Sequence, residues 1–178
     1  MRAHDLMMND DNLLESSSKQ LDRVLGFFPR VETKASVLLA VDTGMLAFLA
    51  AKLPPIRVLT WPEIAVAAAA FLLLGASFWH LYKGAFPKLE GGAESLVYFR
   101  EIAKRREAPF IEAFSKQTPK EHAHDLLGQA WRNAQILTTK YDHVRLAFVF
   151  LALAVPLWVA SLVIIGARVV SAGAQPSP

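Results

Sequence analysis

The sequence contains no cysteine. This absence excludes disulfide scaffolds, thiolate zinc sites, iron–sulfur clusters and cysteine nucleophiles. The motifs GxxxxGK, GxGxxG, GxSxG and HExxH are missing as well, so the common signatures of nucleotide hydrolysis, dinucleotide binding and hydrolase chemistry do not occur. We therefore expect a protein that is not an enzyme, with no metal site and no catalytic residue.

Long apolar stretches are abundant. Apolar residues make up 53% of the 178 residues, and the mean hydropathy is +0.30, which is high for a soluble domain. A bilayer core about 30 Å thick needs about 20 apolar residues in a helix. Residues 35–51, 61–82 and 145–167 come close to or reach this length. The sequence predicts an all-α membrane protein with three transmembrane helices and a small cytosolic helical lobe.

Basic residues are distributed unevenly around these three spans. Five Lys and Arg residues precede the first span and eleven lie within residues 83–145, whereas only Lys52, Arg57 and Arg168 lie on the other side. The positive-inside rule then places residues 1–34 and 83–144 in the cytoplasm. Residues 52–60 form an external loop, and residues 168–178 form a disordered external tail. The expected location is the cell inner membrane.

The cytosolic segments are predicted to be helical. Residues 1–34 form an amphipathic helix that leads into the first span, and a second amphipathic helix runs from Glu94 to Arg106. Thr118 and Glu121 form a capping box at the start of a helix of about 45 residues that continues into the third span. Thr60 and Glu63 repeat this signal at the second span. A lobe this small favours homo-oligomerisation.

Asp42 is the residue that physical chemistry singles out within the spans. A charged side chain at the bilayer centre costs about 2.5–3.5 kcal/mol on insertion scales. Asp42 lines a pore or an inter-subunit seam on one interpretation, and on the other it is protonated or hydrogen-bonded to Thr43 or a neighbouring helix. Pro156 in the third span favours a kink, which is either a hinge or a static feature. Gly44 and Gly75 allow close helix approach.

Basic residues are densest around Arg100, Lys104 and Arg105, followed by Arg106. This patch could bind a ligand phosphate, contact anionic lipid headgroups or simply solubilise a helix near the membrane. The segment as a whole has too little net charge for nucleic-acid binding. His122 and His124 lie on different faces of their helix, so they are interpreted with Asp125 as a solvated first turn.

Three short motifs and their order resemble the transmembrane effectors of Pycsar anti-phage systems. They are ETKASVLL at residues 32–39, Pro87 followed by SLVYFREI at residues 95–102, and Lys140-Tyr141 just before the third span. The similarity covers roughly residues 15–167. Family members often carry a small or amide residue where this chain has Asp42, so the resemblance assigns no role to that acid.

The resemblance implies a two-gene defence system. A uridylate or cytidylate cyclase encoded nearby makes cCMP or cUMP during infection, and this cyclic pyrimidine nucleotide is the activating ligand. The effector then impairs the inner membrane and causes growth arrest or abortive infection. The family supplies no catalytic residue and no ligand-binding residue for this compact form.

Two other classes of function are compatible with the residues alone. The first is a membrane adaptor whose cytosolic helices bind another protein. The second is a small channel or transporter subunit in which Asp42 is a permeation residue.

Overall fold

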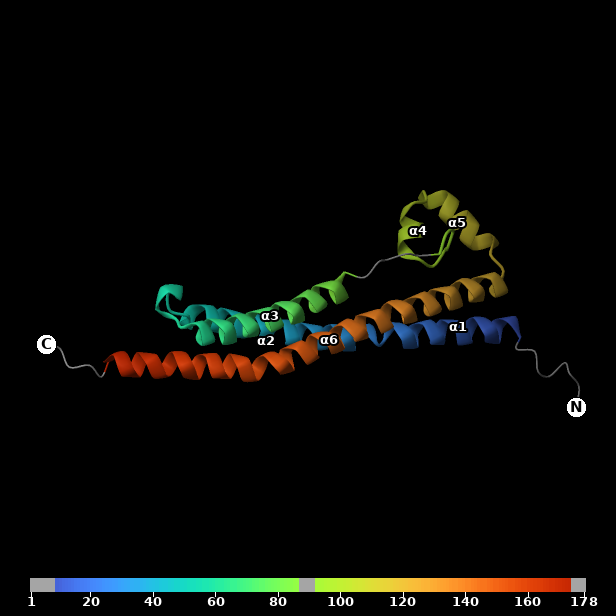
Figure 1. Ribbon diagram of the computed structural model, residues 1–178. Coiled ribbons are helices and arrows are strands. Elements are labelled where there is room, and N and C mark those ends of the chain that lie inside the picture. Colours follow the sequence, from blue (N-terminus) through green and yellow to red (C-terminus); the bar gives the residue numbers. More distant parts are fainter. Residues whose placement is uncertain (1–8, 87–91, 174–178) are drawn as a thin grey trace, which may run out of the picture. The chain divides into compact units, whose positions relative to one another are not determined.

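The computed structural model of the chain describes residues 9–86 and 92–173, and all regular secondary structure within them is helical. Three helical segments are long and apolar enough to cross a membrane. The predicted fold class is confirmed. In chain order the elements are α1 (Asp10–Leu25), α2 (Phe28–Lys52), the 3-10 turn η2 (Ile56–Val58), α3 (Trp61–Ala85), α4 (Phe99–Ala103), α5 (Glu107–Lys116) and α6 (Pro119–Gly173) (Figure 1).

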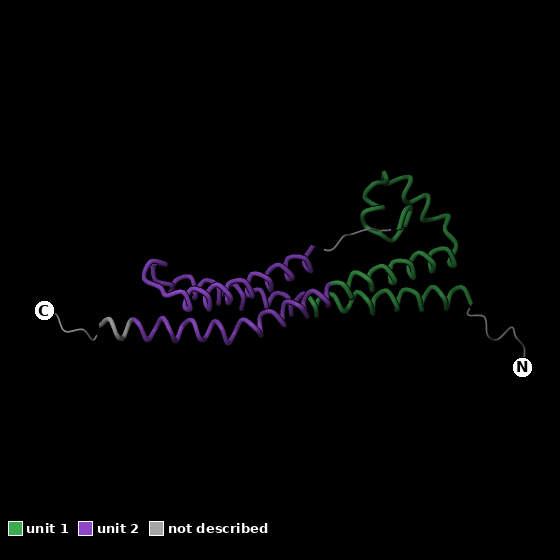
Figure 2. The backbone as a smooth tube through the Cα atoms, in the orientation of Figure 1, with its two compact units in different colours: residues 1–31, 87–139 green, residues 32–86, 140–178 purple. Residues whose placement is uncertain are grey.

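The chain divides into two compact units, each built from segments far apart in the sequence (Figure 2). Unit 1 comprises residues 1–31 and 87–139, and unit 2 comprises residues 32–86 and 140–178. Helix α6 contributes residues 119–139 to unit 1 and its remaining residues to unit 2. One unbroken helix is therefore shared between the two units.

Unit 1 has a small apolar core in which α1 packs against α6. Leu21, Leu126 and Ala130 are buried together, and the partly buried side chains around them are Leu14, Val24 and Val97. Leu14 and Leu21 lie seven residues apart, as do Leu126 and the half-buried Asn133, and this spacing keeps side chains on one helix face. The amphipathic pattern of α1 thus becomes a helix–helix interface.

Unit 2 packs α2, α3 and α6 around two apolar clusters. One cluster is centred on Leu49, Ala70 and Ile165, and the other on Leu74, Leu151 and Ala154. Trp158 packs against both clusters. Alanine at two of these positions lets the helices approach closely, which is how helices associate where lipid supplies no hydrophobic driving force.

Both predicted capping boxes are confirmed. At α3, the Thr60 side chain accepts from the backbone of Glu63, and the Glu63 carboxylate accepts from Thr60 N at 2.7 Å. At α6, Glu121 Oε2 accepts from Thr118 N at 2.8 Å, and Thr118 Oγ1 accepts from Glu121 N at 3.3 Å. These reciprocal bonds satisfy amide groups that the first helical turn leaves without partners. Helix α6 has 55 residues, so it is longer than predicted.

The helix predicted over residues 1–34 is interrupted in the structure. Helix α1 ends at Leu25 and α2 begins at Phe28, with Gly26 as the C-cap of α1. Pro29 has no N–H to donate to the carbonyl of Leu25, so a continuous helix would lack a hydrogen bond there. The proline instead occupies the first turn of α2, where an amide donor is not required.

Three further predictions of local structure are wrong. The helix predicted from Glu94 to Arg106 is reduced to Phe99–Ala103, because Ser95 Oγ accepts from the amides of Val97 and Tyr98 and holds the preceding residues in a turn. Residues 168–173 are helical and not part of a disordered tail, whereas 174–178 lie outside the described residues. A Cβ atom added at Gly44 or Gly75 would meet nothing within 4 Å, so neither glycine marks a close approach between helices.

Candidate functional site

Asp42 lies at the centre of a buried polar contact that joins all three helices of unit 2. Asp42 in α2 and Ser77 in α3 are both completely inaccessible to solvent. Ser77 Oγ lies 2.5 Å from Asp42 Oδ2 and 3.0 Å from the carbonyl oxygen of Ala147 in α6. Asp42 Oδ1 is buried and has no hydrogen-bond partner among the described residues. The acid therefore depends on a single serine hydroxyl.

The number of available protons constrains this contact. A serine hydroxyl has one proton to donate, and a carbonyl oxygen can only accept. Both short contacts of Ser77 are full hydrogen bonds when Ser77 donates to Ala147 and a protonated Asp42 donates to Ser77. A neutral carboxylic acid also costs far less to bury than a carboxylate. The geometry therefore favours the interpretation in which Asp42 is protonated and hydrogen-bonded to a neighbouring helix, with Ser77 as its partner.

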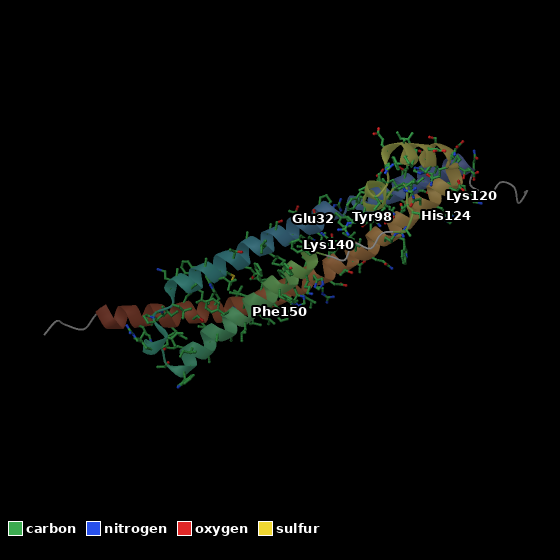
Figure 3. The ribbon with its side chains drawn as sticks, turned by 90° about the horizontal axis from the view of Figure 1, so that it is seen from above. Glu32, Tyr98, Lys120, His124, Lys140 and Phe150 are labelled. Carbon is green, nitrogen blue, oxygen red and sulfur yellow. The ribbon has the colours of Figure 1, made fainter. Side chains whose placement is uncertain are left out.

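Two histidines form a second polar contact between α3 and α6. Nδ1 of His80 lies 3.2 Å from Nδ1 of His143, and the ring centres are 5.5 Å apart. With these separations both nitrogens lie near the line between the ring centres, so the N–H of one ring points at the lone pair of the other. His80 also stacks on Phe150, which is labelled in Figure 3. A Cβ atom on the buried Gly84 would lie 3.2 Å from His143 Cβ, so glycine keeps the helices close here.

Unit 2 is also held together near the loop between α2 and α3. Trp158 Nε1 donates to the carbonyl oxygen of Met45 at 3.0 Å, which joins α6 to α2. Arg168 Nε lies 2.5 Å from Glu63 Oε1, and its NH1 group donates to the carbonyl oxygen of Val58 at 2.6 Å. Arg168 therefore links the end of the third span to the start of α3 and to the preceding loop.

The opposite end of unit 2 carries a cluster of cations. Lys140 Nζ in α6 lies 3.1 Å from Glu32 Oε1 in α2, and both residues are labelled in Figure 3. Lys34 Nζ lies 5.5 Å from the ring centre of Tyr141, within the range of a cation–π interaction. These two contacts place the beginnings of the first and third apolar spans beside one another.

The predicted basic patch of Arg100, Lys104 and Arg105 lies in unit 1, and its cations already take part in contacts within the protein. Lys104 Nζ lies 2.5 Å from Glu101 Oε1, and Arg105 donates to the carbonyl oxygen of Glu94 at 3.0 Å. The hydrogen bond from Lys104, followed by the charges of Lys104 and Arg105, lowers the pKa of Glu101. Arg100 is exposed on α4. A phosphate binding to this patch would have to compete with these internal contacts.

The solvated first turn predicted around Asp125 is wrong. Asp125 is partly buried, and its carboxylate accepts from Ser95 Oγ at 2.6 Å and from Leu96 N at 2.7 Å. Gln129 donates to the same serine at 3.0 Å. These bonds attach the turn before α4 to α6, so Asp125 organises unit 1. The separation of about thirty residues between the partners hid this role from local pattern analysis.

Pro156, the remaining candidate residue, lies apart from these polar contacts. Pro156 is exposed on α6, and the helix continues through it. Within the described residues it takes no part in the hydrogen bonds of Asp42 and Ser77. Within residues 9–86 and 92–173 no group of three or more His, Asp or Glu side chains could hold a metal ion.

The sequence comparison identifies the chain. The model of the Pycsar effector protein domain, PycTM, matches residues 17–166 and so covers most of α1 and almost all of the apolar part of α6. No curated protein and no solved structure matches the chain. The match includes both units and all three spans, and the resemblance noted in the short motifs is confirmed. The chain is a membrane protein that belongs to the Pycsar effector protein family.

Proposed function

We propose that this protein is an effector of bacterial Pycsar anti-phage defence that responds to cCMP or cUMP and impairs the inner membrane. Family membership supports an effector role in anti-phage defence. It also favours a protein that is not an enzyme. The response to a cyclic pyrimidine nucleotide, the inner-membrane location and the membrane damage are the parts that need testing.

The buried acid in the span unit is the observation that carries the membrane part of this proposal. A carboxyl group held by one hydroxyl, with its second oxygen unpartnered, is a costly feature for a bundle that only anchors a domain. If the three helices separate, or if several copies associate, water can reach Asp42. A hydrated carboxylate would then open a polar path where the closed unit has an apolar core.

Helix α6 offers the route by which ligand binding would change the spans. Its residues 119–139 pack in unit 1 and its later residues pack in unit 2, without a helix break between them. A nucleotide that favours one packing of unit 1 would therefore act on the same helix that carries Ala147 and His143. This is a population shift between two packings, and it requires the ligand to bind one of them more tightly.

The test is membrane potential and dye permeability in bacteria that express the chain with an active uridylate or cytidylate cyclase. Cells with a catalytically inactive cyclase are the control. We expect loss of potential only with an active cyclase, and the base of the nucleotide that works identifies the ligand.

An intact membrane with both active cyclases would contradict the proposal and favour the adaptor. Loss of potential that does not depend on any cyclase would instead contradict the nucleotide response and favour a channel or transporter subunit. In either case the Pycsar family assignment would stand, because it rests on the sequence match.

A further inference from the structure

A groove lies between α2 and α6 where the first and third spans begin. Its volume is about 420 Å³, within the range of small-molecule sites. Four residues of α6 and four of α2 line it: Thr33, Lys34, Val37, Leu38, Tyr141, Val144, Arg145 and Phe148. All of them belong to unit 2.

The lining changes from polar to apolar in the same direction along both helices. On α2, Thr33 and Lys34 are followed one turn later by Val37 and Leu38. On α6, Tyr141 and Arg145 precede Phe148 in the same order. Lys34 and Arg145 are also the charged residues directly before the first and third apolar spans. The polar end therefore lies at the headgroup level of a bilayer, and the apolar end points into its core.

The charge at the polar end is positive. Glu32 on α2 is paired with Lys140 at 3.1 Å. Asp142, next to Tyr141 on α6, is exposed and is not one of the residues that line the groove. Within the part of the chain that the structure describes, neither Lys34 nor Arg145 has an ion-pair partner. The ring of Tyr141 holds the Lys34 ammonium beside the groove. Lys34 and Arg145 thus line the groove, and no carboxylate is among its lining residues.

The apolar end is open to the lipid side. Val37 is 58% exposed and Phe148 is 59% exposed, so the groove is not covered by another element of unit 2. Beyond Thr33 and Tyr141 the lining offers no polar side chain except the two cations. A pyrimidine base would lose its hydrogen bonds to water there and gain none. An acyl chain has no hydrogen bonds to lose.

We infer that this groove binds an anionic phospholipid, with its phosphate at Lys34 and Arg145 and the start of one acyl chain along Val37, Leu38 and Phe148. The lipid enters in the orientation that it already has in the leaflet. Such a site would make the packing of α2 against α6 depend on the lipid composition of the membrane. This inference is independent of the nucleotide response.

The test is native mass spectrometry of the purified full-length chain with phosphatidylglycerol or phosphatidylcholine added. We expect phosphatidylglycerol to bind more tightly. In the Lys34→Gln/Arg145→Gln variant its binding constant should fall by about 30-fold, the order expected for two cations near an anionic headgroup. The Lys52→Gln/Arg57→Gln variant is the matched control, because it removes two cations at the other ends of the spans, and Lys52 also lies over a ring, that of Phe48.

A second variant protects the test from a folding defect. Val37→Trp keeps every charge and fills the exposed apolar end of the groove, so it should also weaken phosphatidylglycerol binding while circular dichroism stays unchanged. Equal binding of the two lipids to the unchanged protein would overturn the inference, as would full phosphatidylglycerol binding by both variants. Displacement of bound phosphatidylglycerol by cCMP or cUMP in proportion to their concentration would also overturn it, in favour of a nucleotide site.

Discussion

Ser77 is the residue on which the buried acid depends. We expect Ser77→Ala to lower the free energy of unfolding by about 1–3 kcal/mol, because it leaves a buried carboxyl group without a partner. Ser161→Ala is the matched control: Ser161 is also buried, but its hydroxyl donates to Leu157 of its own helix. Thermal unfolding in detergent, followed by circular dichroism, measures both variants.

The contact between Asp42 and Ser77 can also be removed from both sides. An Asp42→Leu/Ser77→Ala variant has no unsatisfied carboxyl group, so it should recover most of the stability that Ser77→Ala loses. Equal losses in Ser77→Ala and Ser161→Ala would show that the acid does not depend on this hydroxyl.

Asp42→Asn separates hydrogen bonding from charge. An asparagine amide can donate to Ser77 Oγ as a protonated carboxyl group does, but it cannot ionise when water reaches it. We therefore expect Asp42→Asn to unfold at a temperature close to that of the unchanged protein. In cells with an active cyclase, dye permeability should fall to the level of the inactive-cyclase control. Unchanged permeability would remove Asp42 from the proposed polar path.

At the scale of helix pairs, Gly84 controls the distance between α3 and α6. A methyl group at this position would press on His143 Cβ at 3.2 Å, and a Cβ atom cannot turn away. We expect Gly84→Ala to destabilise the protein by about 1–3 kcal/mol through overpacking and to lengthen the hydrogen bond between His80 and His143. Thermal unfolding and the histidine NMR signals report these two effects.

Gly75→Ala is the control for this prediction. A Cβ atom there meets nothing within 4 Å, and alanine is the better helix former by about 0.5–1 kcal/mol. Its unfolding temperature should stay the same or rise. A loss of stability at Gly75 equal to that at Gly84 would mean that helix approach is not what Gly84→Ala disturbs.

The elements that could be predicted are those specified by local chemistry. Apolar length predicted the spans, and the reciprocal side chains of Thr118 and Glu121 predicted the start of α6. The prediction of a helix directly after Glu94 failed for a physical reason. Its amphipathic spacing favours a helix, but the bonds of Ser95 and Asp125 hold a turn there, and Asp125 lies about thirty residues away.

The candidate site was predictable only in part. Asp42 is conspicuous because an acid in an apolar run is costly. Its partner Ser77 is an ordinary small residue in α3, and His80 lies 63 positions from His143, so single-sequence patterns could not pair them. The role of Gly84 was missed for the same reason. Two other glycines were expected to mark close helix approach, but only the structure shows what faces each glycine.

At the scale of the whole molecule, the distribution of charge predicts how the chain crosses the membrane. The absence of cysteine makes this easy to test, since a single introduced cysteine is the only thiol. We expect a membrane-impermeant maleimide to label Arg57→Cys in spheroplasts and to label Lys116→Cys only after lysis. Both residues are exposed, so their accessibility to reagent differs only by the side of the membrane. Labelling in the opposite order would reverse the orientation.

The continuity of α6 is the property of the whole chain that the proposed response needs most. Two glycines inserted after Thr139, where the two units meet along α6, would make this helix easy to break, because glycine is about 1 kcal/mol less favourable than alanine in a helix interior. Each unit keeps its own apolar core, so circular dichroism and the unfolding of unit 2 should change little. Loss of membrane potential with an active cyclase should disappear. The same insertion after Lys116, between α5 and α6, leaves α6 intact and should preserve the response. If both insertion variants still lose membrane potential with an active cyclase, the signal does not travel along α6. Direct association of copies within the membrane then becomes the mechanism to examine.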